Sequence, residues 1–401
     1  MPGARVASVV TEQSSILVIN AGSSSIKFAV FEANLALKLH GQFEGIGTHP
    51  HLQATGSDGA SLVDRRWPAD AKNDIHEIIS QLMQWLESHL GSGQLMAIGH
   101  RVAIGGLAHT GPVVITPAVV DKLRALLPLA PLHQPRNLEP IEALHRLHPK
   151  IPQVACFDTA FHRTLPRVAE QYGLPRSLGE AGAHRYGFHG ISYEYIANQL
   201  AGIDLRAAKG RTVVAHLGSG ASMCALKAGK SVATSMGFSP LSGIVMATRP
   251  GDLDAGLMIW LMRERGMSVD EVEQMLYRES GLKGVSGISG DMRDLLASKE
   301  PRAREAVDLF VYRICTQLGA LCAALGGLDA LVFTAGIGEH APAIRKAVCE
   351  KSAWLGIRLA DAANERSDTR IGANDSSVSV LVIRTNEELM VARHTASLIA
   401  A

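Results

Sequence analysis

Two strand-like stretches joined by a glycine–serine turn decide the fold of this 401-residue chain: Ile16-Leu-Val-Ile19, Asn20-Ala-Gly-Ser-Ser-Ser25 and Ile26-Lys-Phe-Ala-Val-Phe31. Branched and aromatic residues on both sides of a small polar turn are typical of a β-hairpin. The stretch 212–226 repeats this design without a gap, at an offset of 196 residues. In that alignment Gly218 falls on Gly22, Ser219 on Ser23 and His216 on Asn20. Because the offset is close to half of the chain, it predicts a duplicated structure.

Further elements alternate along the chain. Apolar residues recur at three- and four-residue steps over 70–90 and 301–326, which predicts two amphipathic helices. Apolar runs predict strands at 95–102, 330–333 and 378–383, and helices are expected from Pro342 and over 387–399. Strand clusters that alternate with helices predict a mixed α/β protein with both sheet faces covered.

Composition excludes several classes of protein. The 39 basic and 38 acidic residues nearly cancel, whereas a nucleic-acid-binding protein normally carries a basic excess. No apolar run approaches the roughly 20 residues that cross a bilayer, so no membrane partner is expected. Five cysteines without a CxxC pair fit a reducing cytoplasm better than a disulfide framework.

Glycine-rich turns that follow strands can bind phosphate through backbone N–H groups. The P-loop pattern is absent, and Gly336-Ile-Gly-Glu-His-Ala341 fits a dinucleotide-binding turn and a simple helix start about equally well. Arg101 ends an apolar strand, Arg249 lies in Thr-Arg-Pro-Gly-Asp, and Asp158 opens Asp-Thr-Ala-Phe-His. Each alone is more often a satisfied buried polar residue than a catalyst. Together they suit an anionic substrate, because phosphoryl transfer depends mainly on positioning and charge neutralisation.

Nine motifs between residue 16 and the C-terminus carry the most specific signal. They are Val18-Ile-Asn-Ala-Gly-Ser-Ser-Ser-Ile-Lys27, Gly99-His-Arg101, Phe157-Asp-Thr-Ala-Phe-His162, Tyr186-Gly-Phe-His-Gly190, Ala215-His-Leu-Gly-Ser-Gly220, Thr234-Ser-Met-Gly237, Ala247-Thr-Arg-Pro-Gly-Asp252, Phe333-Thr-Ala-Gly-Ile-Gly-Glu339 and Thr385-Asn-Glu-Glu388. In this order they closely resemble the motifs of the acetate kinase family.

The resemblance implies an ATP–carboxylate phosphotransferase of the actin-like superfamily. The implied fold is α/β, with two duplicated domains, each a mixed five-stranded sheet with flanking helices, around a cleft. The N-terminal domain would comprise residues 1–160 and be completed by 388–401, with 1–14 as a flexible tail. The C-terminal domain, 161–387, would bind nucleotide and join two copies into a homodimer. ATP/ADP as co-substrate, Mg²⁺ or Mn²⁺, acetate or another short-chain carboxylate, and a cytoplasmic location are also implied.

By this resemblance four residues are catalytic: Arg101, Asp158, His189 and Arg249. The arginines would hold the carboxylate and the transferring phosphoryl group, Asp158 would orient an arginine, and His189 would steady the phosphoryl group. Asn20 and Glu387 would bind Mg²⁺, which keeps several waters and binds through phosphates.

Two larger sets of residues follow from the same resemblance. The acyl substrate would be bound by Arg101, Ala103, Leu132, His133, Phe188 and Pro240. ATP would be bound by Ser23, Ser25, Lys27, His216, Gly218, Ser219, Gly220, Asp291, Met292, Arg293, Gly336, Ile337, Gly338, Glu339 and His340. The glycines also serve turn geometry, and both roles are compatible because backbone approach to phosphate requires glycine.

The chain departs from the family's motifs at a few positions, among them Ala103, Ile104, Leu107, Ile191, Tyr193, Ser219 and Ala233. Ala103 in place of the usual valine removes two methyl groups from the acyl pocket. At ~0.8 kcal/mol per buried CH₂, we expect propionate to be used nearly as well as acetate. Three alternatives stay open: a propionate or butyrate kinase, an actin-like ATP-driven switch, and a relative that has lost activity.

Overall fold

The structure is a computed structural model and describes residues 14–22, 25–46, 49–68, 74–90, 95–129 and 134–400. Contacts divide the chain into two compact units, Met1–Ala160 with Asn386–Ala401, and Phe161–Thr385. The sequence placed the last boundary after residue 387, whereas Glu387 begins a helix that packs on the first unit. Apart from Ser14, the tail expected over 1–14 lies outside the described residues.

The first unit is built on a mixed eight-stranded sheet in the order β5-β4-β3-β2-β1-β6-β8-β7. Its strands are β1 (Ser15–Ala21), β2 (Ser25–Glu32), β3 (Leu37–Glu44), β4 (His51–Gly56), β5 (Ser61–Arg66), β6 (Leu95–Val102), β7 (Val113–Val114) and β8 (Gln153–Phe157). β1 to β5 pair antiparallel, while β6 and β8 continue parallel to β1. The sheet has three strands more than expected, because the β4–β5 hairpin extends one edge and the short β7 the other.

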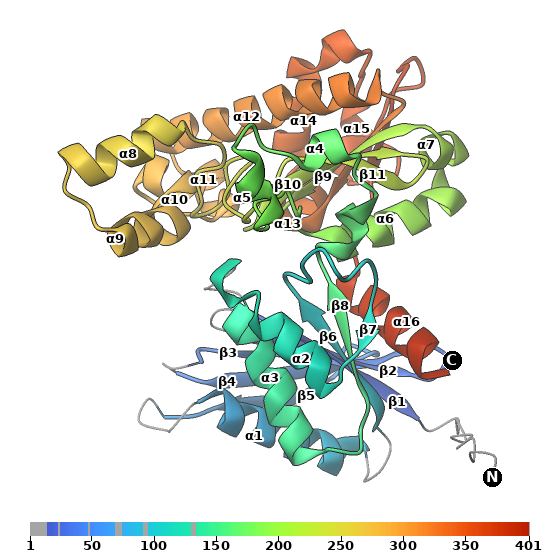
Figure 1. Ribbon diagram of the computed structural model, residues 1–401. Coiled ribbons are helices and arrows are strands. Elements are labelled where there is room, and N and C mark those ends of the chain that lie inside the picture. The colour runs from blue at the N-terminus through green and yellow to red at the C-terminus, as the bar shows by residue number, and fades with distance from the viewer. Residues whose placement is uncertain are drawn as a thin grey trace. The chain divides into compact units, whose positions relative to one another are not determined.

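Helices cover both faces of this sheet (Figure 1). They are α1 (Ile75–Leu90), α2 (Pro117–Arg124), α3 (Gln134–Leu147) and α16 (Glu387–Ala400), with a 3₁₀ turn η1 (Leu127–Leu129). The apolar stripe of α1 packs with α3 on one face, which confirms the amphipathic helix expected there. On the other face α16 lies against β1 and β6, so closely that a side chain at Gly99 would collide with Thr395 and Val391.

The second unit contains a five-stranded mixed sheet in the order β11-β10-β9-β12-β13. Its strands are β9 (Arg211–Leu217), β10 (Ala221–Lys227), β11 (Lys230–Thr234), β12 (Ala330–Thr334) and β13 (Ser379–Val382). Successive residues of β9 alternate between two hydrophobic clusters: Val213 and Ala215 pack in one and Val214 in the other. This two-residue period shows that both faces of the sheet are buried.

Fifteen of the described helical segments begin between Ala160 and Asp361, in the second unit or at its boundary. They are η2 (Ala160–Thr164), α4 (Arg167–Glu170), α5 (Arg176–Glu180), α6 (Gly190–Ile203), α7 (Leu205–Lys209), α8 (Ala255–Glu264), α9 (Val269–Gln274), α10 (Gly281–Ser286), α11 (Met292–Ala297), α12 (Pro301–Leu325), α13 (Ala335–His340), α14 (Pro342–Lys351) and α15 (Asp361–Glu365), together with the π turn η3 (Met275–Glu279) and the 3₁₀ turn η4 (Ala353–Leu355). The long helix α12, expected over 301–326, is the one described helix that could cross a bilayer by length and composition alone. Its apolar side chains lie in the core of the unit, as in the central helix of a globular domain.

The two sheets share a common core, which supports the predicted duplication. The strands β3-β2-β1-β6-β8 and β11-β10-β9-β12-β13 have the same order and directions, and β9 is β1 displaced by 196 residues. The turns differ by one residue, because Ala21 pairs with Ile26 whereas Leu217 pairs with Ala221. The ungapped alignment therefore holds along β1 and β9 and is one residue out of register along β2 and β10.

Candidate active site

Arg101 is the centre of a polar cluster in the first unit. Its Nη2 and Nε donate to the two carboxylate oxygens of Asp158 at 2.7 and 3.3 Å. Its Nη1 donates to Asn20 Oδ1 at 3.1 Å, and the carboxylate of Glu387 lies 3.6 Å from Nε. The two-pronged pairing with Asp158 fixes the plane of the guanidinium group.

The order of the strands explains why these residues meet. β1, β6 and β8 are parallel neighbours, so their carboxyl ends lie at one edge of the sheet. Asn20 lies near the end of β1, Arg101 near the end of β6, and Asp158 directly after β8. Glu387 joins them because α16 begins at the same edge. In open α/β sheets this is the edge at which ligands bind.

The cluster holds a permanent cation with part of its surface accessible. Burial opposes the charge of Arg101, but the carboxylates of Asp158 and Glu387 outweigh it and raise the pKa of Arg101 above its usual range. Burial raises the pKa of Glu387 despite the attraction of Arg101. The side chain of Asp158 is only 2% exposed, whereas that of Arg101 is 26% exposed. About a quarter of the Arg101 side chain therefore remains accessible, while each of its guanidinium nitrogens already has a partner in the cluster.

Asn137 supports this edge from α3, and the sequence analysis missed it. Its Oδ1 accepts from the backbone N–H of Ala103 at 2.9 Å, and its Nδ2 donates to the carbonyl of Ala21 at 3.2 Å. The side chain thus ties the end of β6 to the end of β1. One asparagine in a helix that follows an apolar run gives no sequence signal of this role.

His189 begins the corresponding cluster in the second unit. It precedes α6 with a left-handed backbone (φ 57°), which residues other than glycine rarely adopt. Its Nδ1 lies 2.8 Å from Ser222 Oγ, and Ser222 Oγ lies 2.5 Å from Tyr193 Oη. Ser222 and Tyr193 are fully buried, so both hydroxyls are withdrawn from solvent.

His216 lies beside His189. In β9 it occupies the position that Asn20 has in β1, and its ring stacks on that of His189 with centroids 4.2 Å apart. Its Nδ1 lies 2.9 Å from Ser192 Oγ, which lies 2.8 Å from Thr385 Oγ1. The two stacked imidazoles therefore each have a serine hydroxyl at Nδ1.

Gly220 lets Arg249 approach this pair. A Cβ atom at Gly220 would lie 2.6 Å from Arg249 Nη2 and 3.2 Å from His189 Nε2, so any side chain would displace them. Arg249 Nη1 donates to the carbonyl of Pro240 at 2.8 Å, which holds the guanidinium against the loop that follows β11. An arginine and an imidazole nitrogen thus meet at one glycine.

The turn after β12 is the start of helix α13, which both interpretations of its glycine pattern allow. Glu339 Oε1 accepts from the backbone N–H groups of Ala335 at 2.8 Å and Thr385 at 3.1 Å. The buried Arg345 of α14 donates to the carbonyls of Gly338 and Glu339 at 2.9 Å. One carboxylate oxygen of Glu339, which was expected to contact ATP, is thus engaged by the backbone around its own turn.

The segment Asp291-Met-Arg293 opens α11. Asp291 caps the helix by accepting from the backbone N–H of Arg293, and it pairs with the Arg293 guanidinium at 2.6 Å. These contacts lower the pKa of Asp291 to about 2. The side chain of Met292 is buried in the core of the unit, so only its two neighbours present side chains at the surface.

Three residues proposed from the sequence, Ser23, Leu132 and His133, lie outside the described residues. Ser25 opens β2, and Lys27 pairs with Asn20 across the β1–β2 ladder. Interatomic distances gather Asn20, Asp158 and Glu387 around Arg101 in the first unit, and His216, Gly220 and Arg249 around His189 in the second.

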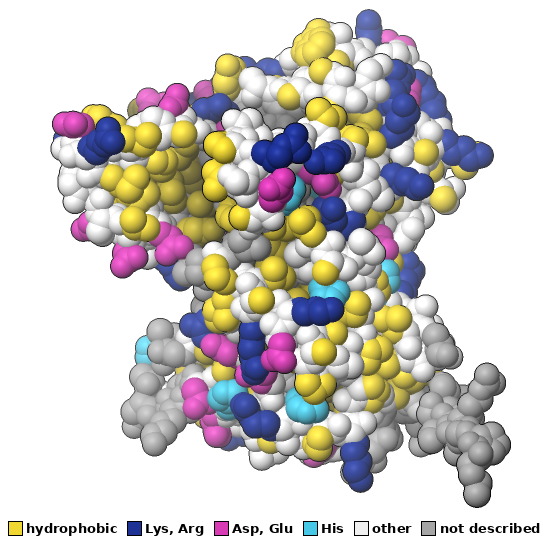
Figure 2. All heavy atoms as spheres, in the orientation of Figure 1, with side chains coloured by type: hydrophobic (Ala, Val, Ile, Leu, Met, Phe, Trp, Pro, Cys, Tyr) yellow, Lys and Arg dark blue, Asp and Glu magenta, His cyan; other side chains and the backbone are white. Residues whose placement is uncertain are grey.

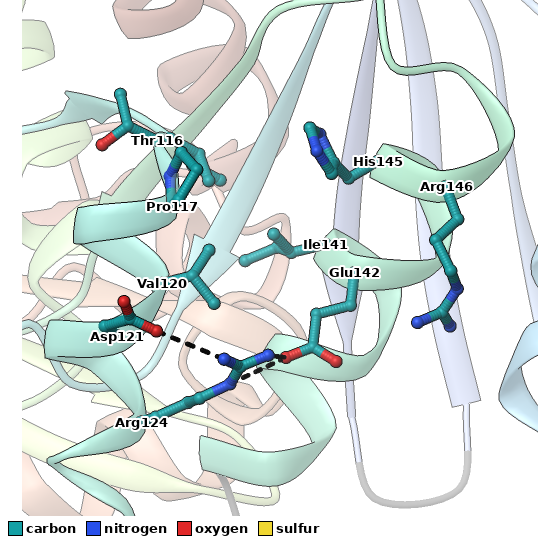
Figure 3. Close-up of a pocket in the computed structure, with 10 residues that line it drawn as sticks. Thr116, Pro117, Val120, Asp121, Arg124, Ile141, Glu142, His145 and Arg146 are labelled. Atoms are coloured by element: carbon teal, nitrogen blue, oxygen red, sulfur yellow. Dashed lines mark hydrogen bonds and ion pairs between the residues drawn. The ribbon is translucent and has the colours of Figure 1, made fainter.

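A cavity of about 320 Å³ opens between α2 and α3 of the first unit (Figure 3). Val120 and Ile141 face each other across it. Arg124 pairs with Asp121 of its own helix at 3.2 Å and joins α2 to α3 by pairing with Glu142 at 2.8 Å. None of the residues that line it belongs to the sets proposed from the sequence.

Two related sheets, an arginine paired with a buried aspartate, and a second arginine at a glycine-rich turn define the class: a phosphotransferase with an actin-like fold. The acetokinase family profile matches residues 15–393. The chain belongs to the acetokinase family.

Relatives and solved structures agree with this assignment. The acetate kinase of Rhodopseudomonas palustris is 53% identical over 387 residues, which cover 94% of this chain and 97% of that protein. The acetate kinase of Rhizobium meliloti is 50% identical and covers 96% and 99%. A propionate kinase structure from Francisella tularensis is 36% identical with a TM-score of 0.91 and covers 96% and 100%. The Porphyromonas gingivalis acetate kinase structure is 35% identical with a TM-score of 0.86 and covers 96% and 99%.

Proposed function

We propose that this enzyme transfers the γ-phosphoryl group of ATP to the carboxylate of acetate, reversibly, to give acetyl phosphate and ADP. A carboxylate oxygen forms a bond to the γ-phosphorus while the bond to the β–γ bridging oxygen breaks, and that oxygen leaves with ADP. Acetate is ionised at pH 7, so no general base is needed. The observation that carries the proposal is the Arg101 guanidinium, oriented by the buried Asp158 on a side chain that is 26% exposed.

Charge neutralisation is the main task of the protein in such a transfer. Arg101 and Arg249 would bind the carboxylate and the phosphoryl oxygens, and both are already held, by Asp158 and by the Pro240 carbonyl. Their positions then need little adjustment during the reaction. His189 would donate to a phosphoryl oxygen from Nε2, the nitrogen that faces Gly220.

Asn20 and Glu387 fit a magnesium site by their chemistry, because an amide oxygen and a carboxylate both lie next to the Arg101 guanidinium. No group of three or more His, Cys, Asp or Glu among the described residues could cage a metal alone. This suits Mg²⁺, which keeps several waters and takes further oxygens from nucleotide phosphates. The ion, or Mn²⁺ in its place, would supply neutralising charge at the β- and γ-phosphates.

ATP would be bound by turns of both units, with the backbone of the glycine-rich segments at the phosphates. The residues proposed are Ser23, Ser25, Lys27, His216, Gly218, Ser219, Gly220, Asp291, Arg293, Gly336, Ile337, Gly338 and His340. Met292 and Glu339 would contribute by holding the backbone of their segments in place. The side chain of Met292 is buried, and a carboxylate oxygen of Glu339 accepts from the backbone of its own turn.

The residues proposed to bind the acyl group are Ala103 of the first unit and Phe188 and Pro240 of the second, together with Leu132 and His133. Ala103 leaves room for one more methylene than valine would, and the Francisella neighbour is a propionate kinase. We therefore propose that propionate is a second substrate. The ratio of kcat/KM for the two acids tests this, and a large advantage for acetate would contradict it.

We also propose a cytoplasmic homodimer joined through the second unit. Helix α8 has no buried residue although most of its side chains are apolar, and Figure 2 shows apolar side chains gathered over α8 and α9. Its exposed apolar residues include Leu257, Ile259, Trp260 and Met262. Contiguous apolar surface of this kind marks protein–protein contacts. Sedimentation should show a dimer that Trp260→Glu dissociates; a monomeric wild-type chain would contradict the proposal.

The reaction is tested by trapping acyl phosphate with hydroxylamine in the presence of ATP, Mg²⁺ and acids of increasing length. We expect product with acetate and propionate, and none after Arg249→Ala. Arg304→Ala serves as the matched control and should keep activity, because Arg304 is exposed and has no proposed role in the reaction. If the intact protein forms no acyl phosphate but still hydrolyses ATP, the actin-like switch is favoured. If it does neither, it is an inactive relative.

A further inference from the structure

The side chains behind His189 form a buried chain of two hydroxyl groups. Tyr193 Oη lies 2.5 Å from Ser222 Oγ, and Ser222 Oγ lies 2.8 Å from His189 Nδ1. Both hydroxyl residues are fully buried, so water does not compete for these hydrogen bonds. The chain ends on the ring nitrogen of His189 that is turned away from Gly220.

Three rings from two elements, η2 and β9, hold Tyr193 in place. Its centroid lies 6.5 Å from that of Phe161, 5.7 Å from His162 and 6.3 Å from His216. Tyr193 is also a position at which the chain departs from the family's Gly-Thr-Ser-His motif. The hydroxyl that reaches Ser222 is therefore held in a fixed orientation.

The chemistry of the groups sets the direction of the hydrogen bonds. A phenol is far more acidic than an alkyl hydroxyl, so Tyr193 is the better donor and Ser222 Oγ the better acceptor. The Ser222 hydroxyl then donates its own proton to His189 Nδ1. A ring nitrogen that accepts a hydrogen bond carries no proton, so in the neutral imidazole the proton is on Nε2.

That proton points toward the reacting groups. His189 Nε2 and Arg249 Nη2 both approach Gly220. We propose that Tyr193 and Ser222 are positioning residues that hold the proton of His189 on Nε2, where it donates to an oxygen of the transferring phosphoryl group. This inference rests on the proposed function. Its advantage is that the donor is oriented before the reaction begins.

Three variants separate this role from a structural one. Tyr193→Phe removes only the hydroxyl, and we expect kcat to fall about tenfold while KM for ATP and acetate changes less than twofold. Ser222→Ala breaks the contact with His189 itself and should lower kcat at least as much. Tyr195→Phe removes a hydroxyl from the same helix and should leave kcat unchanged. Thermal unfolding of each variant shows whether the fold is retained.

A double-mutant cycle with His189→Asn tests whether Tyr193 acts through His189. Asparagine tolerates the left-handed backbone at this position, so the fold should survive. In that background Tyr193→Phe should no longer lower kcat. An equal loss in both backgrounds, or no loss in either, would overturn the proposal.

Long-range ¹⁵N–¹H spectra of histidine-labelled protein test the tautomer without any assay of activity. The His189 signals are assigned by their absence in His189→Asn. We expect the proton on Nε2 in the wild type and a mixture of tautomers in Tyr193→Phe; a proton on Nδ1 in the wild type would overturn the inference. If the wild type makes no acyl phosphate, the proposed function fails, whereas these spectra still decide the tautomer.

Discussion

One buried histidine of the second unit should make this protein sensitive to acid. His162 Nε2–H donates to the carbonyl of Phe188 at 3.0 Å, so Nδ1 accepts from Ser231 Oγ at 2.9 Å. The side chain has no exposed surface. Burial lowers the pKa of His162 to about 4, because loss of solvation outweighs the favourable contact with the Phe188 carbonyl.

The sign and size of the effect follow from proton binding. The unfolded chain binds a proton at this residue near pH 6.5, whereas the folded chain binds it only near pH 4. The neutral histidine therefore makes its full contribution to the free energy of unfolding above about pH 6.5, and this contribution is lost as the pH falls toward 4. A shift of about 2.5 pKa units corresponds to about 3 kcal/mol in total, of which about 2 kcal/mol is lost at pH 5.

Urea unfolding at pH 7.5 and pH 5.0 measures this loss. The free energy of unfolding of the wild type should fall by about 2 kcal/mol more between the two values than that of His162→Gln. His145→Gln, which removes an exposed histidine of α3, should keep the pH dependence of the wild type. Equal pH dependence in the wild type and His162→Gln would refute the reasoning. Protonation would also turn Nδ1 of His162 from an acceptor into a donor toward Ser231. The same ring contacts the carbonyl of Phe188, the residue before His189.

Three further substitutions test the site by steady-state kinetics. Asp158→Asn keeps the shape but removes the charge paired with Arg101, and kcat should fall about a hundredfold. Ala103→Val should fill the acyl pocket and lower the propionate-to-acetate ratio of kcat/KM about tenfold. Gly220→Ala would place a methyl group 2.6 Å from Arg249 Nη2, so kcat should fall at least tenfold.

A defined result would contradict each of these three predictions. Full activity of Asp158→Asn would mean that the charge does not set the position of Arg101. An unchanged acid preference in Ala103→Val would place this residue outside the acyl pocket. Gly179→Ala is the matched control for Gly220→Ala, because a side chain there would meet no other atom within 4 Å.

The common core of the two sheets could be predicted because both hairpins carry strong local signals. The glycine–serine turns and the branched residues around them locate β1, β2, β9 and β10. The difference of one residue between the turns could not be predicted, since loops of both lengths accept the same small residues. The short strand pieces over residues 34–64 were expected, but their pairing along the sheet edge as β4 and β5 was not, because edge pairing depends on residues distant in sequence. The two-residue strand β7 was missed because so short a strand has a weak pattern.

The charged residues of the site were easier to predict than the neutral ones. Arg101 and Asp158 lie at the ends of apolar strands, and parallel neighbours bring such ends together. Ser222 meets His189 from 33 residues away, and its hydroxyl gives no pattern of its own. Glu339 shows a different limit, because the sequence does not tell whether a carboxylate beside a glycine-rich turn bonds to the turn, to a ligand or to both.

The packing of α16 on the first unit has a consequence for synthesis on the ribosome. The sheet of that unit is nearly complete once β8 has been made, but α16 begins only at Glu387, after the whole second unit. At about 5–20 residues per second, the face around Gly99 waits on the order of 10 to 50 seconds for its cover. The half of the protein that is made first is thus the half that is finished last, and a chain stalled before residue 387 would hold a complete second unit beside an exposed apolar sheet.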